Sequence, residues 1–330
     1  MAKQYLFING EVITVNQDNE VVEAVAVREN EIIAVGSDED ILALKDADSK
    51  IINLEGKTLM PGFIDSHLHI SMYGTNSISI SCKDKEIQSV SDLLKKLKER
   101  AEQTPANEWV RAWGYNETTI VDERFPTKQE LDEISTEHPI MVARACGHIS
   151  AVNSKALEIA GIGENTPNPA GGEIQRNRED KPTGLLLENA HMEMFNIAAF
   201  SKEELSQAHK IAFEHFAAKG ITSIHDASGY GLSNFNSLQT DSKNGLIKQR
   251  LYVMVGALFD AQRVVKHMVE AGIYTGLGDE KFKLDPAKLF LDESSSGPTL
   301  WCRVPYTSDP TNRGIHYFTQ EEVDEIFIPA

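Results

Sequence analysis

The sequence predicts an α/β fold in which a small β-domain precedes the strands and helices of a (β/α) barrel. Short runs of alternating apolar and polar residues, separated by turn residues, fill the first sixty positions. After Pro61 the pattern changes to strands that alternate with amphipathic helices, which favours parallel βα units. We therefore predict a β-domain over residues 1–60 and a barrel portion over residues 61–330.

The predicted β-domain begins with the run YLFI, which Asn9 and Gly10 separate from EVITV. Both turn residues accept positive φ, so a type I′ hairpin is expected between these two runs. The runs EAVAVRENEIIAVG and SKIINLEGKTL supply the other strands. The whole pattern is typical of a small antiparallel domain.

The clearest βα unit of the barrel portion begins with a helix after Ser201. SKEE forms a capping box, Gly220 ends the helix, and the strand ITSIHDA follows directly. A strand over 250–257, a helix from Asp260 to Gly272 and a strand over 287–293 continue the alternation. Together with the strand that precedes the helices, these segments give four barrel strands.

A stretch over about residues 75–200 does not repeat this spacing. It contains a predicted helix over SDLLKKLKERAEQ, a capping box from Thr127 to Glu130, and a loop rich in Gly, Pro and Asn at 161–184. Long ordered segments inside compact domains usually serve as lids or binding elements. We expect an insertion that covers one face of the barrel.

Composition excludes several classes of function. Fifty acidic and thirty-two basic residues give a net charge of -18, which repels nucleic-acid backbones and anionic membrane surfaces. The three cysteines lie far apart and form no CxxC pair, which argues against a disulfide framework and a thiolate zinc site. Without a signal-peptide pattern or a membrane-spanning run, the sequence predicts a soluble cytoplasmic protein without nucleic-acid or membrane partners.

The segment LMPGFIDSHLHI places two histidines one residue apart at the end of an apolar run. Side chains at i and i+2 of a strand share a face, so His67 and His69 can bind one metal ion. Asp65 shares that face and can hold a ring N–H. Two hydrogen-bonded histidines at a strand end are the alternative for an isolated pair. Their place at the end of the first barrel strand favours the metal, since TIM-barrel enzymes carry their chemistry at that end.

Six segments, in this order, resemble the YtcJ-like branch of the amidohydrolase superfamily. They are MPGFIDSHLH, GHISAVNSKALEIAGI, PAGGEIQRN, PTGLLLENA, GITSIHDAS and KLFLDESSSGPT. The resemblance covers nearly the whole chain and implies a β-sandwich attached to a metal-dependent hydrolase TIM barrel. It also implies hydrolysis of a C–N bond other than a peptide bond, with N-substituted formamide deformylases as similar enzymes.

The resemblance further implies which side chains hold the metal. His67 and His69 match the first-strand ligands of the family, and Lys288 matches a lysine that is carboxylated and bridges two metals in binuclear members. A fourth barrel strand over 287–293 agrees with this assignment. Lys288 stands beside Pro286, however, and a strand-entry lysine that reaches solvent is an equal alternative.

Three more side chains are candidates for substrate contact or for orienting the metal ligands. His148 either reaches the substrate cavity, as the resemblance suggests, or positions the following helix through hydrogen bonds. Only one of His225 and Asp226 can face inward at the end of their strand, and we favour His225. Asp292 shares the face of Lys288 on the expected fourth strand and can orient it or contact substrate.

The family takes two further histidines and an aspartate base from barrel strands five, six and eight, and we do not find these before residue 330. After the insertion is set aside, about half of the length of a (β/α)₈ barrel remains after residue 60. The sequence therefore predicts a truncated barrel whose base lies beyond residue 330. Its open strand edge favours a homo-oligomer or completion by another chain.

We predict a zinc-dependent amidohydrolase with one or two divalent metal ions and a small-molecule substrate that carries an amide or N-formyl group. An inactive regulatory or binding protein on the same scaffold, like the exoenzyme regulators that resemble this family, is the alternative. A lyase or isomerase with the same first-strand ligands is a third hypothesis. Metal content separates the first two.

Overall fold

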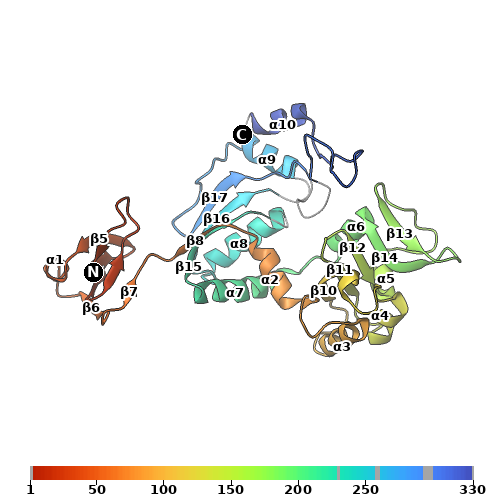
Figure 1. Cartoon of the computed structure of the whole chain (residues 1–330), viewed down its shortest axis with the longest axis horizontal. Coiled ribbons are helices and arrows are strands. Elements are labelled where there is room, and N and C mark those ends of the chain that lie inside the picture. Colours follow the sequence, from red (N-terminus) through yellow and green to blue (C-terminus); the bar gives the residue numbers. More distant parts are fainter. Residues whose placement is uncertain (1–2, 229–230, 257–260, 293–299, 329–330) are drawn as a thin grey trace. The chain divides into compact units, whose positions relative to one another are not determined.

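The chain has a mixed α/β fold, which the computed structural model describes over residues 3–228, 231–256, 261–292 and 300–328 (Figure 1). The residues form two compact units. The first unit comprises Met1–Asp65 and Gly220–Ser223, and the second comprises Ser66–Lys219 and Ile224–Ala330. Among the described residues, no helix combines the length and the apolar character that a membrane span requires.

The first unit contains two small β-sheets. The four-stranded sheet has the order β5-β4-β1-β6, with strands Glu31–Gly36, Ala24–Arg28, Gln4–Ile8 and Lys50–Asn53. The three-stranded sheet has the order β3-β2-β7, with strands Val21–Val22, Glu11–Ile13 and Thr58–Leu59. Leu6, Ala24, Ala26 and Ile41 form a core between the first sheet and α1 (Asp38–Leu42).

Two expectations for this unit are wrong. Strand β1 pairs with β6 in parallel, and β2 pairs with β7 in parallel, so the domain is mixed instead of antiparallel. No hairpin joins β1 to β2, because these strands belong to different sheets. Asn9 does adopt a positive φ of 54°, but its main-chain N–H donates to Asp38, and that of Gly10 donates to Glu23. The turn predicted for a hairpin is therefore bonded to residues distant in the sequence, Asp38 and Glu23, and does not join two paired strands.

The barrel-type part of the chain is a four-stranded sheet with the order β17-β16-β15-β8. Its strands are Phe282–Ala287, Arg250–Val255, Ile221–Asp226 and Phe63–Leu68. The helices that alternate with them are α7 (Lys202–Ala218), α8 (Leu232–Lys243) and α9 (Ala261–Glu270), which Figure 1 shows beside the sheet. Val255, Val264 and Leu284 form an apolar cluster that joins β16 and β17 to α9.

The fourth strand lies five residues earlier than expected. β17 ends at Ala287, and Lys288 follows it with its main-chain N–H bonded to the Val255 carbonyl at 2.8 Å. Phe282 and Leu284 are buried whereas Lys283 is half-buried, so FKLD is the alternating run that marks this strand. The expected strand over 287–293 is therefore wrong, because only its first residue, Ala287, belongs to β17 and pairs with β16.

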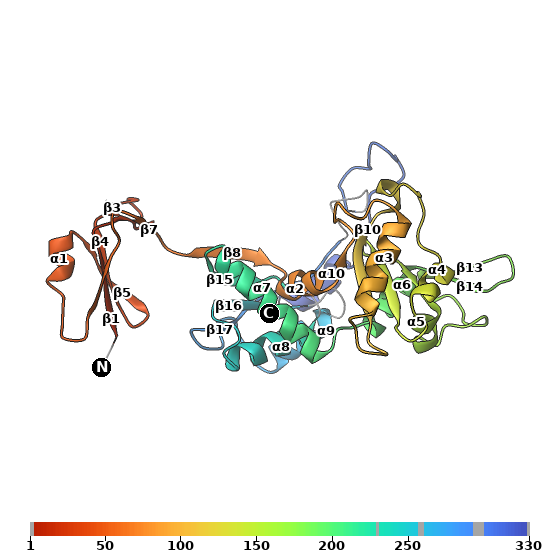
Figure 2. The same cartoon turned by 90° about the horizontal axis from the view of Figure 1, so that it is seen from below.

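The segment that interrupts the barrel-type spacing forms a sheet of its own. Its six strands have the order β13-β14-β12-β11-β10-β9, over Gly172–Arg176, Pro182–Glu188, Ile149–Val152, Ile140–Arg144, Val110–Tyr115 and Ile80–Ser81. Figure 2 shows its helices around the strands: α3 (Val90–Ala101), α4 (Lys128–Ile134), α5 (Ser154–Ile159) and α6 (Asn189–Ile197). Two apolar clusters hold these helices to the sheet.

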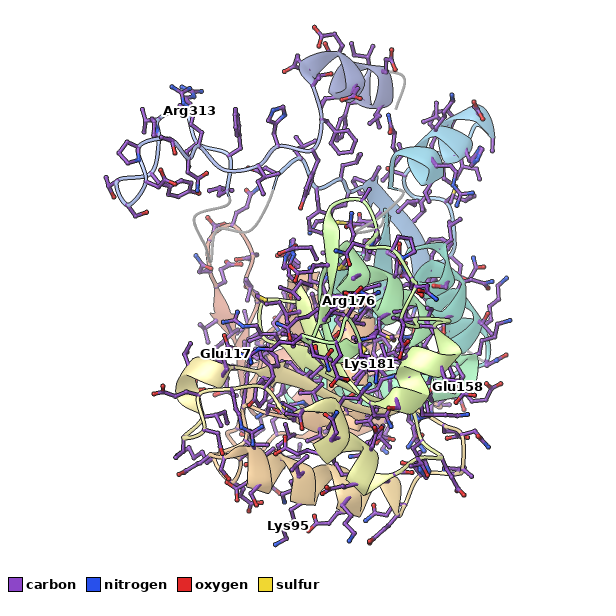
Figure 3. All side chains as sticks on the ribbon, turned by 90° about the vertical axis from the view of Figure 1, so that its right-hand side faces the viewer. Lys95, Glu117, Glu158, Arg176, Lys181 and Arg313 are labelled. Carbon is purple, nitrogen blue, oxygen red and sulfur yellow. The ribbon has the colours of Figure 1, made fainter. Side chains whose placement is uncertain are left out.

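Charged side chains cover this part of the chain, as Lys95, Glu158 and Lys181 show in Figure 3. Arg176, also labelled there, has a more specific role. Its guanidinium donates to the carbonyls of Glu164 at 2.7 Å and Asp180 at 2.8 Å, which ties down the predicted loop over 161–184.

Helix α2 (Ile70–Ile78) packs closely on α7, and Gly74 permits this contact. A Cβ atom at Gly74 would lie 2.5 Å from the main-chain oxygen of Ala208. We expect Gly74→Ala to lower the free energy of unfolding by about 1–3 kcal/mol, because main-chain atoms cannot move aside as a flexible side chain can. Urea unfolding measures this loss. Gly163→Ala is the control, since a Cβ there meets no atom within 4 Å; equal losses for the two variants would contradict the prediction.

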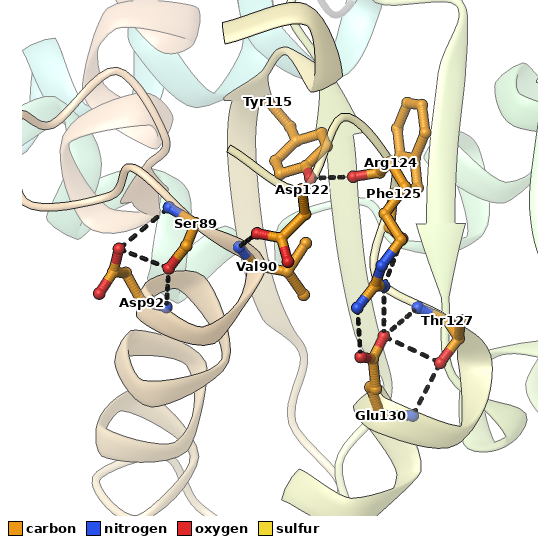
Figure 4. A network of polar contacts seen from close by, with 9 residues as sticks. All are labelled: Ser89, Val90, Asp92, Tyr115, Asp122, Arg124, Phe125, Thr127 and Glu130. Carbon is orange, nitrogen blue, oxygen red and sulfur yellow. Dashed lines mark hydrogen bonds and ion pairs between the residues drawn. The ribbon is translucent and has the colours of Figure 1, made fainter. Parts of the chain in front are cut away.

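Helices α3 and α4 begin with capping boxes, and the box predicted at Thr127 and Glu130 is present (Figure 4). Arg124 adds two hydrogen bonds to the Glu130 carboxylate, at 2.8 and 2.7 Å. These Arg124 hydrogen bonds are the main reason why the pKa of Glu130 falls to about 2. The Glu130 carboxylate thus accepts hydrogen bonds both from the start of helix α4 and from the Arg124 guanidinium.

The low pKa of Glu130 predicts a pH-dependent contribution to stability. The folded pKa lies below the ordinary value of 4.5, so the contribution is complete above pH 4.5 and is lost as the pH falls toward about 2. We expect Glu130→Gln to lower the free energy of unfolding by about 1 kcal/mol at pH 7 and by less at pH 3. Urea unfolding at both pH values, with exposed Glu133→Gln as control, checks this. A loss that does not change with pH would disprove it.

Candidate metal centre

Two imidazoles meet where strand β8 passes into helix α2. His67 lies on β8, and His69 occupies the N-cap position of α2, directly after the strand. Their ring centroids are 5.5 Å apart and the ring planes are nearly perpendicular, at 83°. The two rings are close because their residues are two positions apart at the end of β8. The start of helix α2 fixes the main chain of His69.

A main-chain carbonyl orients the ring of His69. Its Nδ1 atom lies 2.5 Å from the carbonyl oxygen of Ser228, which can only accept, so Nδ1 carries the proton and Nε2 keeps its lone pair. Burial lowers the pKa of His69, and the nearby Lys288 and His67 act in the same direction against the Ser228 hydrogen bond. The neutral ring with an available Nε2 is the form that binds a metal ion.

The buried carboxylate of Asp226 caps helix α2 in place of His69. The His69 side chain makes no capping hydrogen bond, and the N–H of Ile70 donates to Asp226 Oδ1 at 2.9 Å. Burial is the largest effect on this carboxyl group and raises its pKa to about 7, although its hydrogen bonds oppose the rise. The N–H of Ile70 in the first turn of α2 is thus bonded to a carboxylate on β15. The His69 ring is not needed as a cap and remains available to bind a metal ion.

Lys288 joins the two histidines. Its Nζ atom lies 3.3 Å from His67 Nε2, and burial lowers the pKa of the amine, with the Asp226 carboxylate opposing. A protonated amine at this distance would repel a divalent cation. Metal binding here therefore requires a neutral or carboxylated Lys288.

The other candidates from the sequence have different partners. His225 Nδ1 lies 2.7 Å from Asp285 Oδ2, and the His225 ring stacks on Tyr252 at 4.7 Å. His148 Nδ1 lies 2.9 Å from Glu188 Oε2 at the end of the six-stranded sheet. The structure thus places His225 and His148 in two separate carboxylate pairs.

Asp65 and Asp292 complete the set of candidates. Asp65 lies on β8 within the first unit. Asp292 Oδ2 accepts from the Trp301 N–H at 3.2 Å, and its expected place on the strand of Lys288 is wrong because β17 ends at Ala287. Glu293, in the segment KLFLDESSSGPT, lies outside the described residues.

Asp226 supports this site, although the sequence pattern favoured its neighbour His225. It lies on the same face of β15 as Ile224, and both are fully buried. We favoured His225 because alternation allows one inward residue, but the face that packs on helices can also carry a functional carboxylate. An acidic residue at the end of an otherwise apolar strand face was the available signal.

The donor set fits part of a catalytic metal site. No three His, Cys, Asp or Glu side chains come together as a metal-binding group in the described ranges. Catalytic zinc usually takes three protein ligands and a water molecule. His67 and His69 suit two of these positions, and Lys288 suits a third only as a carbamate, whose oxygen is a metal ligand.

Comparison with known proteins gives consistent matches along most of the chain. Residues 50–330 match the family model described as "Amidohydrolase family". N-substituted formamide deformylase of Arthrobacter pascens is 32% identical over 232 residues, which are 68% of this chain and 42% of that protein. Putative amidohydrolase YtcJ of Bacillus subtilis is 29% identical over 97% of this chain and 60% of its own length.

A solved structure shares the fold. The crystal structure of an uncharacterized metal-dependent hydrolase from Pyrococcus horikoshii has a TM-score of 0.82 and 22% identity to this chain. The match covers 99% of this chain and 63% of that one. The chain thus spans less than two thirds of the length of each of these three proteins.

Proposed function

Because this chain belongs to the amidohydrolase family, we propose that it carries the metal centre of an enzyme that hydrolyses a carbon–nitrogen bond other than a peptide bond. The proposed fold is a TIM barrel with an N-terminal β-sandwich, of which β8, β15, β16 and β17 are the first four barrel strands. The proposed substrate is a small molecule with an amide or N-formyl group, as the name of the Arthrobacter relative suggests.

The single observation that carries this proposal is the approach of Lys288 to His67 beside an oriented His69. His67 and His69 would hold the ion through ring nitrogens, and carboxylated Lys288 would add an oxygen. When bound, one or two zinc ions would supply an activated water and polarise the scissile carbonyl. The Ser228 carbonyl fixes the His69 ring, and Asp226 fixes the main chain that carries it.

Amine release tests the proposal directly. The purified chain, loaded with Zn²⁺, is incubated with a panel of N-formyl and N-acyl amines, and the free amine is quantified with and without a chelator. We expect zinc binding, and only weak release that depends on the metal, because two family histidines and the aspartate base were not found in this sequence. A folded chain that binds no zinc and releases no amine would favour the inactive regulatory or binding protein.

A further inference from the structure

Five buried polar side chains form a continuous series from Asp226 on β15 to Asp241 on α8. They come from β15, α8, α2 and α7, and each is at most 5% exposed. We call them the buried chain, which consists of Asp226, Asn234, Ser71, His209 and Asp241. Charged and polar groups are rarely buried unless hydrogen bonds satisfy them, so the partners of each member matter.

Every link in the buried chain is a hydrogen bond. Asn234 Nδ2 donates to Asp226 Oδ2 at 3.0 Å, and the Ser71 hydroxyl donates to Asn234 Oδ1. His209 Nε2 lies 2.7 Å from Ser71 Oγ, and His209 Nδ1 lies 2.7 Å from Asp241 Oδ2. The Asp226 end meets the metal centre, because Asp226 also accepts from the main chain of Ile70, next to His69.

Counting donors assigns the protons on His209. The amide of Asn234 presents its NH₂ to Asp226, so its oxygen faces Ser71 and can only accept. Ser71 has one hydroxyl proton, which goes to that oxygen, so His209 Nε2 must donate to Ser71. The Nδ1–H of His209 donates to the Asp241 carboxylate, so His209 carries both ring protons and forms a buried ion pair with Asp241.

The order serine, histidine, aspartate is that of a catalytic triad, but the geometry excludes a nucleophile. Ser71 is 2% exposed, so no substrate reaches its hydroxyl. Its proton is committed to Asn234, whereas a nucleophilic serine gives its proton to the histidine. The buried chain must therefore act by holding its members in place.

We propose that His209 is a positioning residue for the metal centre: paired with Asp241, it holds Asp226 through Ser71 and Asn234, and Asp226 in turn holds the main chain beside His69. This inference rests on the proposed metal-binding function and adds a specific set of supporting residues to it. With His209 donating to Ser71, every hydrogen bond in the buried chain has a fixed direction. Asn234 therefore always presents its NH₂ to the Asp226 carboxylate. Residues that orient metal ligands in this way typically contribute about 10- to 100-fold to metal affinity.

Two measurements on the full chain test the proposal. Nitrogen NMR of the metal-free protein at pH 7 should show His209 with both ring nitrogens protonated. Competition with a chromophoric chelator should show zinc affinity lowered about 10- to 100-fold in Ser71→Ala and in His209→Gln. Gln249→Leu is the matched control, because Gln249 is also buried and bonds the main chain of α7 at Phe213, outside the buried chain.

The outcomes separate this inference from the proposed function. A wild-type chain that binds no zinc would overturn the metal centre and the positioning role together. Tight zinc binding by the wild type, with equal affinity in Ser71→Ala and Gln249→Leu, would overturn only the positioning role, as would a neutral His209. If His209→Gln does not fold, Ser71→Ala and the NMR measurement still decide, because Ser71→Ala removes one hydroxyl and no charge.

Discussion

Replacing His69 with alanine is expected to lower the zinc affinity of the chain by more than about 100-fold. Residues that merely orient a ligand contribute about 10- to 100-fold, and His69 is itself a proposed ligand. Its Nε2 lone pair is directed by the Ser228 hydrogen bond, so the variant loses a donor that is already oriented. The same loss is expected for His67→Ala. Zinc competition with a chromophoric chelator gives the affinities, and amine release from the best substrate of the panel should fall with them.

His267→Ala is the control for this experiment, because His267 is an exposed histidine on α9. It should bind zinc as the wild type does. If His69→Ala keeps the wild-type affinity while remaining folded, the two histidines are hydrogen-bonded strand-end residues, and the metal centre is wrong.

The nearness of His67 and His69 could be predicted because it depends only on two neighbouring positions, the end of strand β8 and the residue directly after it. Alternation places residues i and i+2 on one face wherever the strand lies in the fold. The capping boxes at Ser201 and Thr127 are equally local, and both are present. The family could also be predicted, because six ordered segments carry the resemblance that the family match over residues 50–330 confirms.

Features that depend on distant residues were missed or misplaced. Asn9 and Gly10 have the composition of a hairpin turn, but partners elsewhere in the chain draw the strands on either side into separate sheets. The fourth barrel-type strand was placed on the more apolar run after Pro286, although the alternating FKLD run forms the ladder with β16. Apolar content alone does not distinguish these two runs.

Apart from Asp226, the members of the buried chain had no local signal. Ser71 and Asn234 are 163 positions apart, and Ser71 and His209 are 138 positions apart. These members lie on helices, where a single polar residue is usually expected to face solvent. The packing of α2 and α8 on α7 brings these side chains together, and Gly74 allows the close contact of α2 with α7.

Removing the amine of Lys288 is expected to have the other large effect. A neutral amine adds CO₂ to give a carbamate and one released proton. The carbamate would supply an oxygen as the third metal ligand beside the two imidazoles. We therefore expect bicarbonate to raise the zinc affinity of the wild type, and Lys288→Met to lower the affinity about 100-fold and to remove the bicarbonate effect. Intact-protein mass spectrometry under native conditions should detect the added CO₂ on the wild type alone. Lys283→Met is the control, because Lys283 lies on β17, which Lys288 follows, and approaches the Tyr252 ring. If zinc affinity changes neither with bicarbonate nor in Lys288→Met, Lys288 is not a metal ligand. It would then be a lysine that reaches solvent, which is the alternative that the sequence left open.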